Sequence, residues 1–249
     1  FFGLFNKISL FSLNSFSVNY NNLKMKNNNK SRRKFFSAMA LGVTATSLPF
    51  LTNTAYAASD ELAATKFVRV EDWFDQIKGS HRIVYDGSTP HGGLPVIWNW
   101  AFYASNNETG SADSDITAMT VFRHSGLMYA FNDQIWKKYQ LGAIAGVNDP
   151  YTDAPSLRNT VYEPKEKDFP LPGIDGVKRL QERGALFCAC NLATKVFSSV
   201  AAKNMNLDPI EVYNDWVNGL LPGIQLVPSG VWALGRAQEK GCGYIFAGG

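Results

Sequence analysis

The segment Gly184-Ala-Leu-Phe-Cys188-Ala-Cys190-Asn191-Leu-Ala-Thr194 gives the clearest indication of the fold. Its apolar run at 185–189 predicts a short buried strand, and a helix is expected to begin directly after it and to run over 191–203. A buried strand that leads straight into a helix is typical of a parallel α/β sheet. We therefore expect Cys190 at the carboxyl end of a strand, at the start of the next helix.

The same alternation of strands and helices continues on both sides of this segment. We expect further strands at 81–86, 116–122, 224–227 and 243–246, and helices at 94–107, 133–139, 174–182, 209–217 and 229–240. The pattern predicts an α/β fold with a mostly parallel sheet and helices on both faces. Residues 148–173 hold five Pro and several Asp, so a long surface excursion is expected within 145–175.

Cys190 is the residue that we expect to carry chemistry. Ligands and reactive groups collect at the carboxyl edge of open α/β sheets, and a helix N-terminus stabilises an anion. A thiolate at this position could attack sulfane sulfur and carry it as a persulfide. The alternative is that Cys188 and Cys190 are ordinary small buried residues, and it applies most to Cys188, which lies inside the expected strand.

Other polar residues are expected at the same edge of the sheet. Arg123 and His124 directly follow the expected strand at 116–122 and could hold an anion together. His124 could also deprotonate the Cys190 thiol or ligate a metal, or it could simply make hydrogen bonds within the fold. Two further residues are candidates for binding a ligand or cofactor. His91 lies in the loop after the first expected strand, and Asn191 directly follows Cys190.

A second thiol and a cofactor are further alternatives. Cys242 precedes the last expected strand and could lie near Cys190, where the two could form a disulfide or pass sulfur; otherwise it is a small turn residue. Cys188 is the other candidate second thiol. A metal or haem could be held by side chains from His91, His124, Cys190 and Cys242. No paired C-x-x-C motif indicates such a site, so the sequence requires no cofactor.

Four motifs taken together resemble a known family. They are His-Arg-Ile-Val-Tyr-Asp at 81–86, Val-Phe-Arg-His at 121–124, Gly-x-x-Phe-x-x-Cys-Asn at 184–191 and, most specific, Leu-Val-Pro-Ser-Gly-Val-Trp-Ala-Leu-Gly-Arg-Ala-Gln-Glu-Lys-Gly at 226–241. The resemblance is to the DsrE/DsrF-like family of small α/β proteins, and it covers roughly residues 80–247.

This resemblance implies a three-layer α/β sandwich, a homo-oligomer and a cysteine that relays sulfur. Cys190 is similar in position to the family's sulfur-accepting cysteine, so a sulfur donor or acceptor would be a partner. The chain departs from the family in its excursion at 145–175, in its additional Cys188 and Cys242 and in its N-terminal leader. The best-known sulfur-relay members are cytoplasmic.

The N-terminal leader has the pattern of an export signal. Ser31-Arg32-Arg33-Lys34-Phe35-Phe36 precedes a modestly apolar stretch at 38–51. Ala55-Tyr56-Ala57 then supplies the small residues of a signal-peptidase site, so cleavage is expected between Ala57 and Ala58. The order of these features resembles a twin-arginine (Tat) signal. It predicts the Tat translocase as a partner and a periplasmic protein without a stable membrane anchor, an uncleaved anchor being the alternative.

The chain is therefore expected to divide into four parts. Residues 1–24 precede the first Met, Met25, and are expected to be an upstream extension of the reading frame that is not part of the natural protein. Residues 25–57 form the signal peptide and 58–79 an N-terminal extension. Residues 80–249 form one α/β domain.

The charge distribution argues against nucleic-acid binding. The formal net charge is +3, from 24 Lys and Arg and 21 Asp and Glu, but seven of the basic residues and none of the acidic ones precede residue 58. The rest of the chain, with 17 positive and 21 negative groups, has a net charge of −4. We expect an exported protein with sulfur-carrier or thiol chemistry on Cys190. The alternatives are a metal- or small-molecule-binding protein without catalysis and a non-catalytic oligomer subunit.

Overall fold

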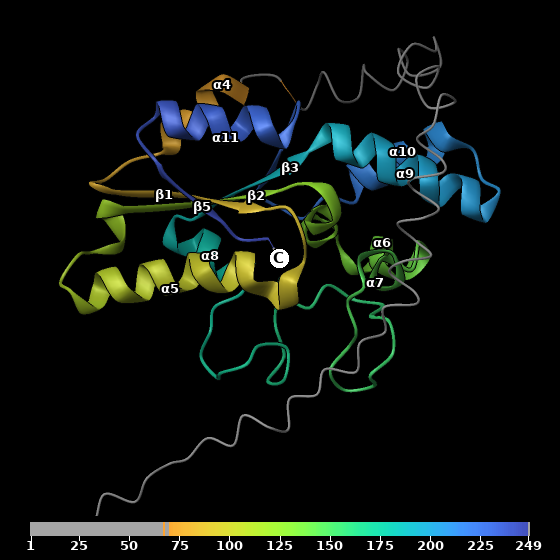
Figure 1. Ribbon diagram of the computed structural model, residues 1–249, viewed down its shortest axis with the longest axis horizontal. Coiled ribbons are helices and arrows are strands. Elements are labelled where there is room, and N and C mark those ends of the chain that lie inside the picture. Colours follow the sequence, from red (N-terminus) through yellow and green to blue (C-terminus); the bar gives the residue numbers. More distant parts are fainter. Residues whose placement is uncertain (1–66, 68–69, 249) are drawn as a thin grey trace, which may run out of the picture.

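A five-stranded sheet in which each strand is parallel to its neighbours forms the centre of the molecule (Figure 1). The computed structural model describes residue 67 and residues 70–248. In the spatial order β4-β3-β2-β1-β5, the strands are β4 (Ile224–Val227), β3 (Leu186–Cys190), β2 (Ile116–Phe122), β1 (His81–Gly87) and β5 (Gly243–Phe246). The expected extension at 1–24 and the export signal, with Arg32, Arg33, Ala57 and Ala58, lie outside the described residues.

The strand sequences place apolar side chains on both faces of the sheet. Successive residues of a strand point to opposite faces. In β1, Ile83 and Tyr85 belong to one buried cluster and Val84, between them, to the other. All seven residues of β2, the central strand, are buried. A sheet that is covered on both faces needs such continuous apolar strands, which is why the sequence indicated a parallel sheet.

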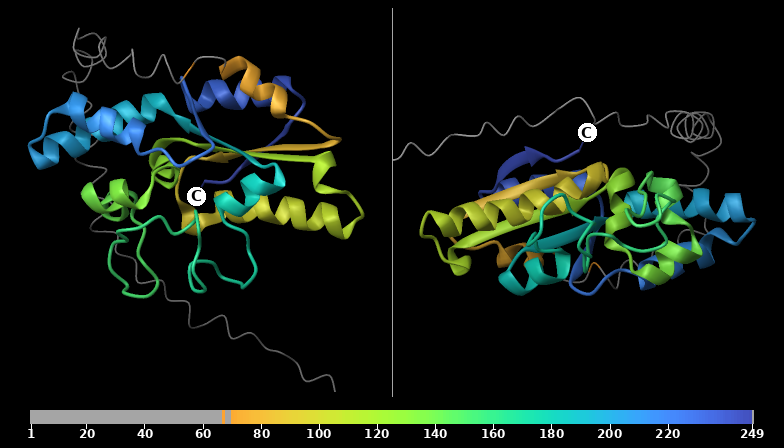
Figure 2. Two further views of the ribbon diagram at one scale, coloured as in Figure 1. Left: turned by 180° about the vertical axis from the view of Figure 1, so that it is seen from behind. Right: turned by 90° about the horizontal axis from the view of Figure 1, so that it is seen from below.

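Helices cover the two faces. Figures 1 and 2 show α5 (Leu94–Glu108) and α8 (Val177–Arg183) on one face, and α11 (Gly230–Glu239) and α4 (Val70–Trp73) on the other. The protein is thus a three-layer α/β sandwich. This confirms the predicted fold class, a parallel sheet with helices on both faces.

A further group of helices extends past the carboxyl edge of the sheet. It comprises the 3-10 helix η5 (His124–Ala130), α6 (Asp133–Lys138), α7 (Leu141–Ala145), α9 (Asn191–Met205) and α10 (Pro209–Asn218). The ring of Trp216 lies 5.0 Å from that of Phe131 and 5.7 Å from that of Tyr139, between ring centroids.

In the part of the chain that the structure describes, no helix combines the length and apolarity needed to cross a membrane.

The boundaries of β3 and α8 are among those that differ from the expectation. β3 covers 186–190 rather than 185–189, so Cys190 is both the last strand residue and the N-cap of α9. α8 begins at 177 rather than 174. The reason is Gly176, whose extended backbone lies against the chain at 161–162, where an added Cβ would be 2.6 Å from the Tyr162 carbonyl oxygen.

Part of the expected N-terminal extension belongs to the folded domain. Phe74 is fully buried, and its ring lies 5.5 Å from the ring of Trp232 on α11. Ile77 is also buried in this cluster. Residues 70–79 therefore complete the helical layer over the α11 face.

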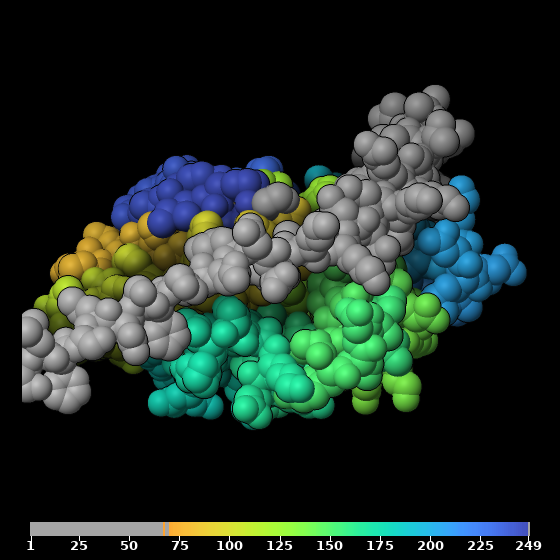
Figure 3. Space-filling model, turned by 60° about the horizontal axis from the view of Figure 1, so that its bottom comes forward, coloured from red at the N-terminus to blue at the C-terminus, as the bar shows by residue number. Residues whose placement is uncertain are grey.

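Residues 146–176 contain no helix and no regular strand, as expected for an excursion. They form one continuous surface in the space-filling view, coloured green to teal (Figure 3). Three of its residues, Asn159, Val161 and Phe169, are buried and anchor the excursion to the core. A partly buried ion-pair group also holds it, in which Arg158 donates to Asp149 and to both carboxylate oxygens of Asp168.

Candidate functional site

A cavity of about 230 Å³ lies at the carboxyl edge of the sheet, between the N-terminal ends of α9 and α11. Four of its lining residues carry polar or reactive groups: Arg123, His124, Cys190 and Ser229. The others are apolar: Leu192, Ala193, Val196, Phe197, Gly230 and Val231. Of the residues expected to act together, the structure therefore brings Cys190, Arg123 and His124 to one cavity.

Cys190 is held at the point where β3 becomes α9. Its Sγ accepts a hydrogen bond from the Ala193 N–H at 3.3 Å, and the Thr194 hydroxyl donates to the Cys190 carbonyl oxygen at 2.9 Å. The cysteine is thus the side-chain cap of a 15-residue helix. An N–H group and a helix N-terminus both favour negative charge on the sulfur, so the geometry suits a thiolate. Its exposed fraction is 6%.

Arg123 forms a bidentate ion pair with Asp86. Its Nε and one terminal nitrogen donate to the two carboxylate oxygens at 2.6 and 2.8 Å. The Tyr244 hydroxyl of β5 donates to the same carboxylate at 2.9 Å. The Asp86 hydrogen bonds raise the pKa of Arg123, and a charged Cys190 sulfur adds to this effect. Arg123 is therefore fixed in place and close enough to Cys190 for the two charges to interact.

His124 lies beside Arg123 with a left-handed backbone (φ +47°). Its ring meets the Phe197 ring edge-on at 5.8 Å, between ring centroids. Burial lowers its pKa, the positive charge of Arg123 lowers it further, and a hydrogen bond to the Ser88 carbonyl opposes both effects. His124 is consequently a neutral imidazole at neutral pH, which can accept a proton.

The lowered pKa of His124 predicts a loss of stability in mild acid. The unfolded chain takes up a proton at this residue near pH 6.5, while the folded chain does so only at lower pH. The stabilising contribution is present above the unfolded pKa and is lost as the pH falls through the folded pKa. Urea unfolding at a series of pH values should show His124→Asn losing less stability below about pH 6.5 than the wild type.

His91→Asn is the matched control for this measurement. His91 is exposed and also has a left-handed backbone (φ +41°), which Asn tolerates. It should keep the pH dependence of the wild type. Equal pH profiles for the wild type and His124→Asn would contradict the assignment.

Apolar side chains surround the open mouth of the cavity. Leu192 is 47% exposed, Val196 41% and Val231 66%. Gly230 allows this close arrangement, because a Cβ at this position would lie 2.7 Å from the Arg123 Cβ. These residues were not expected from the sequence, although helical spacing does place 192 and 196 on one face of α9.

The remaining candidates lie elsewhere. Asn191 is buried, and its side-chain oxygen accepts a hydrogen bond from the Tyr213 hydroxyl at 2.7 Å, so its role is to join α9 to α10. His91 is exposed in the loop after β1 and does not line the cavity. Cys188 is fully buried among side chains of the α11 face, and burial raises its pKa well above the ordinary value. It is a core residue.

Cys242 is far from Cys190, and the expectation that the two could pair is wrong. Cys242 precedes the start of β5 at the amino edge of the sheet, whereas Cys190 ends β3 at the carboxyl edge. Three inter-strand spacings of about 4.8 Å separate β3 from β5, whereas a disulfide needs Cα atoms within about 7 Å. All three cysteines are free, and burial raises the pKa of Cys242 to about 11.

The same geometry rules out a metal or haem site formed by His91, His124, Cys190 and Cys242 together, because Cys242 lies too far from the others. Within residues 67 and 70–248, no group of three or more His, Cys, Asp and Glu side chains converges to hold a metal ion. Asp86 is a site residue that no sequence pattern singled out, since it appears there only as the last residue of the motif at 81–86. Asp86 can be recognised once β1 is aligned with β2, because Asp86 then pairs with Val121 and Gly87 with Phe122 at the ends of the two strands.

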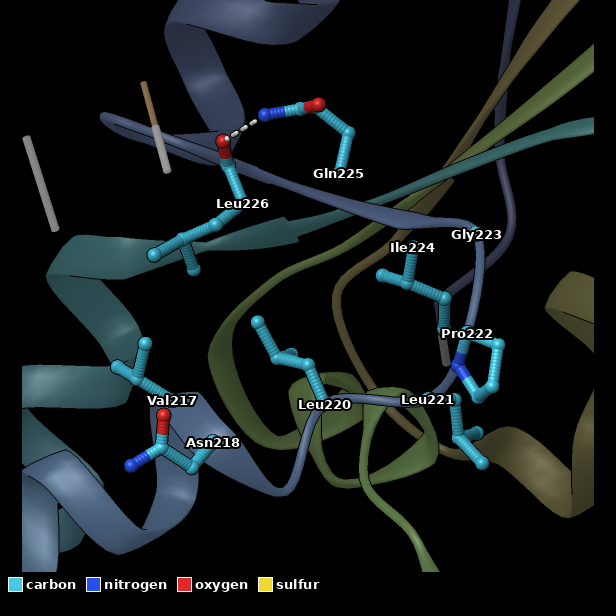
Figure 4. A pocket seen from close by; sticks show the side chains of 9 residues that line it. All are labelled: Val217, Asn218, Leu220, Leu221, Pro222, Gly223, Ile224, Gln225 and Leu226. Atoms are coloured by element: carbon cyan, nitrogen blue, oxygen red, sulfur yellow. Dashed lines mark hydrogen bonds between the residues drawn. The ribbon is translucent and has the colours of Figure 1, made fainter. Parts of the chain in front are cut away.

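A second cavity, of about 250 Å³, lies where the chain passes from α10 to β4 (Figure 4). The side chains of Val217, Leu220, Ile224 and Leu226 contribute to its wall, and Gln225 donates a hydrogen bond to the Leu226 carbonyl. None of its lining residues is a nucleophile or an ionisable group. The Cys190 cavity is therefore the candidate functional site.

Comparison with known proteins finds similarity among solved structures. No protein-family model and no curated protein matches this chain. A solved structure of a protein of unknown function from Methanobacterium thermoautotrophicum is 19% identical, with a TM-score of 0.32; the match covers 67% of this chain and 99% of that one. The resemblance to the DsrE/DsrF-like family stays a prediction from the motifs.

Proposed function

We propose that this protein is a DsrE-like sulfur carrier that holds sulfane sulfur on Cys190. The observation that carries the proposal is the position of the Cys190 sulfur, which caps α9, accepts the Ala193 N–H and opens into a cavity shared with His124 and Arg123. A nucleophilic sulfur needs a stabilised anion, a nearby proton acceptor and room for the incoming group. These requirements meet at Cys190, whereas Cys188 and Cys242 lack them.

The proposed transfer is balanced without an oxidant or a reductant. The Cys190 thiol gives its proton to neutral His124, and the thiolate attacks the outer sulfur of a persulfide donor R–S–SH. The donor S–S bond breaks, R–S⁻ leaves and takes up a proton, and a new S–S bond forms on Cys190. An acceptor thiolate then attacks the outer sulfur of the Cys190 persulfide and regenerates the free thiol.

Export is part of the proposal and rests on the order of three features: the Ser31-Arg32-Arg33-Lys34-Phe35-Phe36 pattern, the apolar stretch at 38–51 and the cleavage site at 55–57. A Tat substrate is transported in folded form, so a periplasmic carrier would reach its compartment with the Cys190 cavity already built. Homo-oligomerisation likewise rests on the family resemblance.

Sulfur loading measured by intact mass tests the carrier role. The reduced, folded protein is treated with an alkyl or an aryl hydropersulfide released in situ. We expect a mass gain of whole sulfur atoms that a reductant removes, and complete loss of this gain in Cys190→Ser. Cys242→Ser is the matched control and should load like the wild type, because that thiol lies outside the cavity and burial raises its pKa to about 11.

Two outcomes would contradict the carrier role. The first is a folded, reduced wild type that gains no sulfur from either donor. The second is equal loading of Cys190→Ser and the wild type. Reversible binding of a small molecule in the cavity without any change in mass would instead favour the non-catalytic binding protein.

A further inference from the structure

We propose that the Cys190 cavity selects small, uncharged, apolar sulfur compounds and disfavours anionic ones. This inference rests on the proposed function, since it names the substrate class for the same thiol. Its basis is the combination of matched charges, apolar lining and small volume in the cavity.

The positive groups around the cavity already have negative or accepting partners. Arg123 is the only permanently charged residue among those that line it, and two of its nitrogens are committed to Asp86. Asp86 is itself buried, with an exposed fraction of 2%, and its carboxylate neutralises the charge of Arg123 within the protein. An entering anion would have to compete with a carboxylate that already accepts two charge-assisted hydrogen bonds from the guanidinium.

At each of the two helix N-termini, one main-chain N–H group already has an acceptor within the protein. At α9 the Ala193 N–H donates to the Cys190 sulfur, and at α11 the Trp232 N–H donates to the Ser229 hydroxyl at 3.3 Å. His124 is neutral at neutral pH because burial and Arg123 lower its pKa. With the thiolate formed, the cavity already holds one negative charge, which repels a second anion.

The lining and the volume favour a short apolar group. Leu192, Val196 and Val231 form the exposed mouth, and Phe197 lies deeper at 2% exposure. Covering these side chains removes apolar surface from water, which contributes about 25 cal/mol for each Å². A volume of about 230 Å³ is smaller than the roughly 300–1,000 Å³ of pockets for drug-sized ligands, so a short alkyl or aryl group is the fitting size.

Charge-matched thiol probes test this selectivity directly. Alkyl methanethiosulfonates react with a thiolate by forming a mixed disulfide and releasing methanesulfinate. The same reactive group is available with a propyl, a sulfonatoethyl or a trimethylammonioethyl substituent, which are uncharged, negative and positive. The rate of labelling at Cys190 is followed by mass in a Cys242→Ser background and divided by the rate with a small thiol in solution.

We expect the propyl probe to label Cys190 at least about tenfold faster than the sulfonatoethyl probe after this correction, in the range that local charge changes association rates. Val231→Lys, which adds a cation at the mouth, should raise the sulfonatoethyl rate several-fold. Leu171→Lys is the matched control, because Leu171 is similarly exposed, at 62% against 66%, but lies in the excursion. It should leave the rates unchanged.

The outcomes separate this inference from the proposed function. Sulfonatoethyl labelling as fast as propyl labelling, or faster, overturns the inference even if sulfur loading on Cys190 succeeds. A strong preference for the propyl probe supports it even if no persulfide accumulates, in which case the carrier role alone fails. A Cys190 that reacts with none of the three probes in the folded protein contradicts both.

Discussion

Replacing Asp86 by Asn is expected to lower the free energy of unfolding by about 3 kcal/mol, the cost of breaking a buried ion pair by removing one partner. The carboxylate is 2% exposed and accepts three hydrogen bonds, two from Arg123 and one from Tyr244. The substitution leaves the Arg123 charge without its partner in a half-buried position. Urea unfolding of the wild type and the variant measures the difference.

Asp215 provides a matched control for this prediction. It also accepts hydrogen bonds from one cation and one tyrosine hydroxyl, Lys138 at 2.8 Å and Tyr139 at 2.7 Å. Its exposed fraction is 37%, and that of Lys138 is 57%, so water screens the pair. Asp215→Asn should cost less than about 1 kcal/mol, as exposed ion pairs do. Similar losses for the two variants would show that burial of Asp86 does not set its contribution.

The same Asp86→Asn variant should change the charge selectivity of Cys190. Once Asp86 no longer neutralises it, the Arg123 guanidinium becomes a free cation at the cavity. Labelling by the sulfonatoethyl probe should then accelerate relative to the propyl probe. An unchanged ratio in a folded variant would mean that the Asp86–Arg123 pair does not exclude anions.

Replacing Asn159 by Ala is expected to cost about 4 kcal/mol, the largest effect that we predict for a single polar side chain. The Asn159 amide nitrogen donates to the carbonyl oxygens of Tyr129 and Phe131, both at 2.9 Å. Its oxygen accepts the N–H groups of Val161 and Tyr162 at 3.0 and 3.1 Å. Removing the amide leaves four main-chain groups without this partner and opens a void where the excursion meets the core.

Thermal or urea unfolding of Asn159→Ala measures this loss. Asn148→Ala is the control in the same segment, because Asn148 is exposed and makes one hydrogen bond to the Asp153 carbonyl. It should cost no more than about 0.5 kcal/mol. A loss below about 1 kcal/mol for Asn159→Ala would mean that the excursion can relax away from the core at little cost.

Local sequence patterns were sufficient to predict most of the fold. Strands β2, β4 and β5 begin and end where the apolar runs predicted, and Ser229, where a helix was expected to begin, caps α11. These elements are set by burial and by capping groups within a few residues. The start of α8 was wrong because Gly176 is held extended by the excursion, a contact between distant segments that no local pattern contains.

The site was predictable where it depends on strand ends and unpredictable where it depends on strand order. Cys190 ends a strand and Arg123 and His124 follow one, and parallel strands bring their carboxyl ends to one edge. Cys242 was misplaced because it precedes a strand instead of ending one, and because β5 joins the sheet beside β1. Asp86 was missed because its significance appears only when β1 and β2 are aligned in register.

The pairing of β5 with β1 also governs when the protein can finish folding. Among the described strands, β1 is made first and has one edge unpaired until β5 is made, since Asp86 pairs with Phe246. The sheet therefore cannot close before β5 has been made, and a chain that stops before β5 would present a bare edge of β1. Tyr244 of the same late strand also completes the hydrogen bonds of Asp86. A chain that stops before β5 would thus lack both the closed sheet and the fully bonded carboxylate that holds Arg123, which ties maturation of the Cys190 cavity to the synthesis of β5.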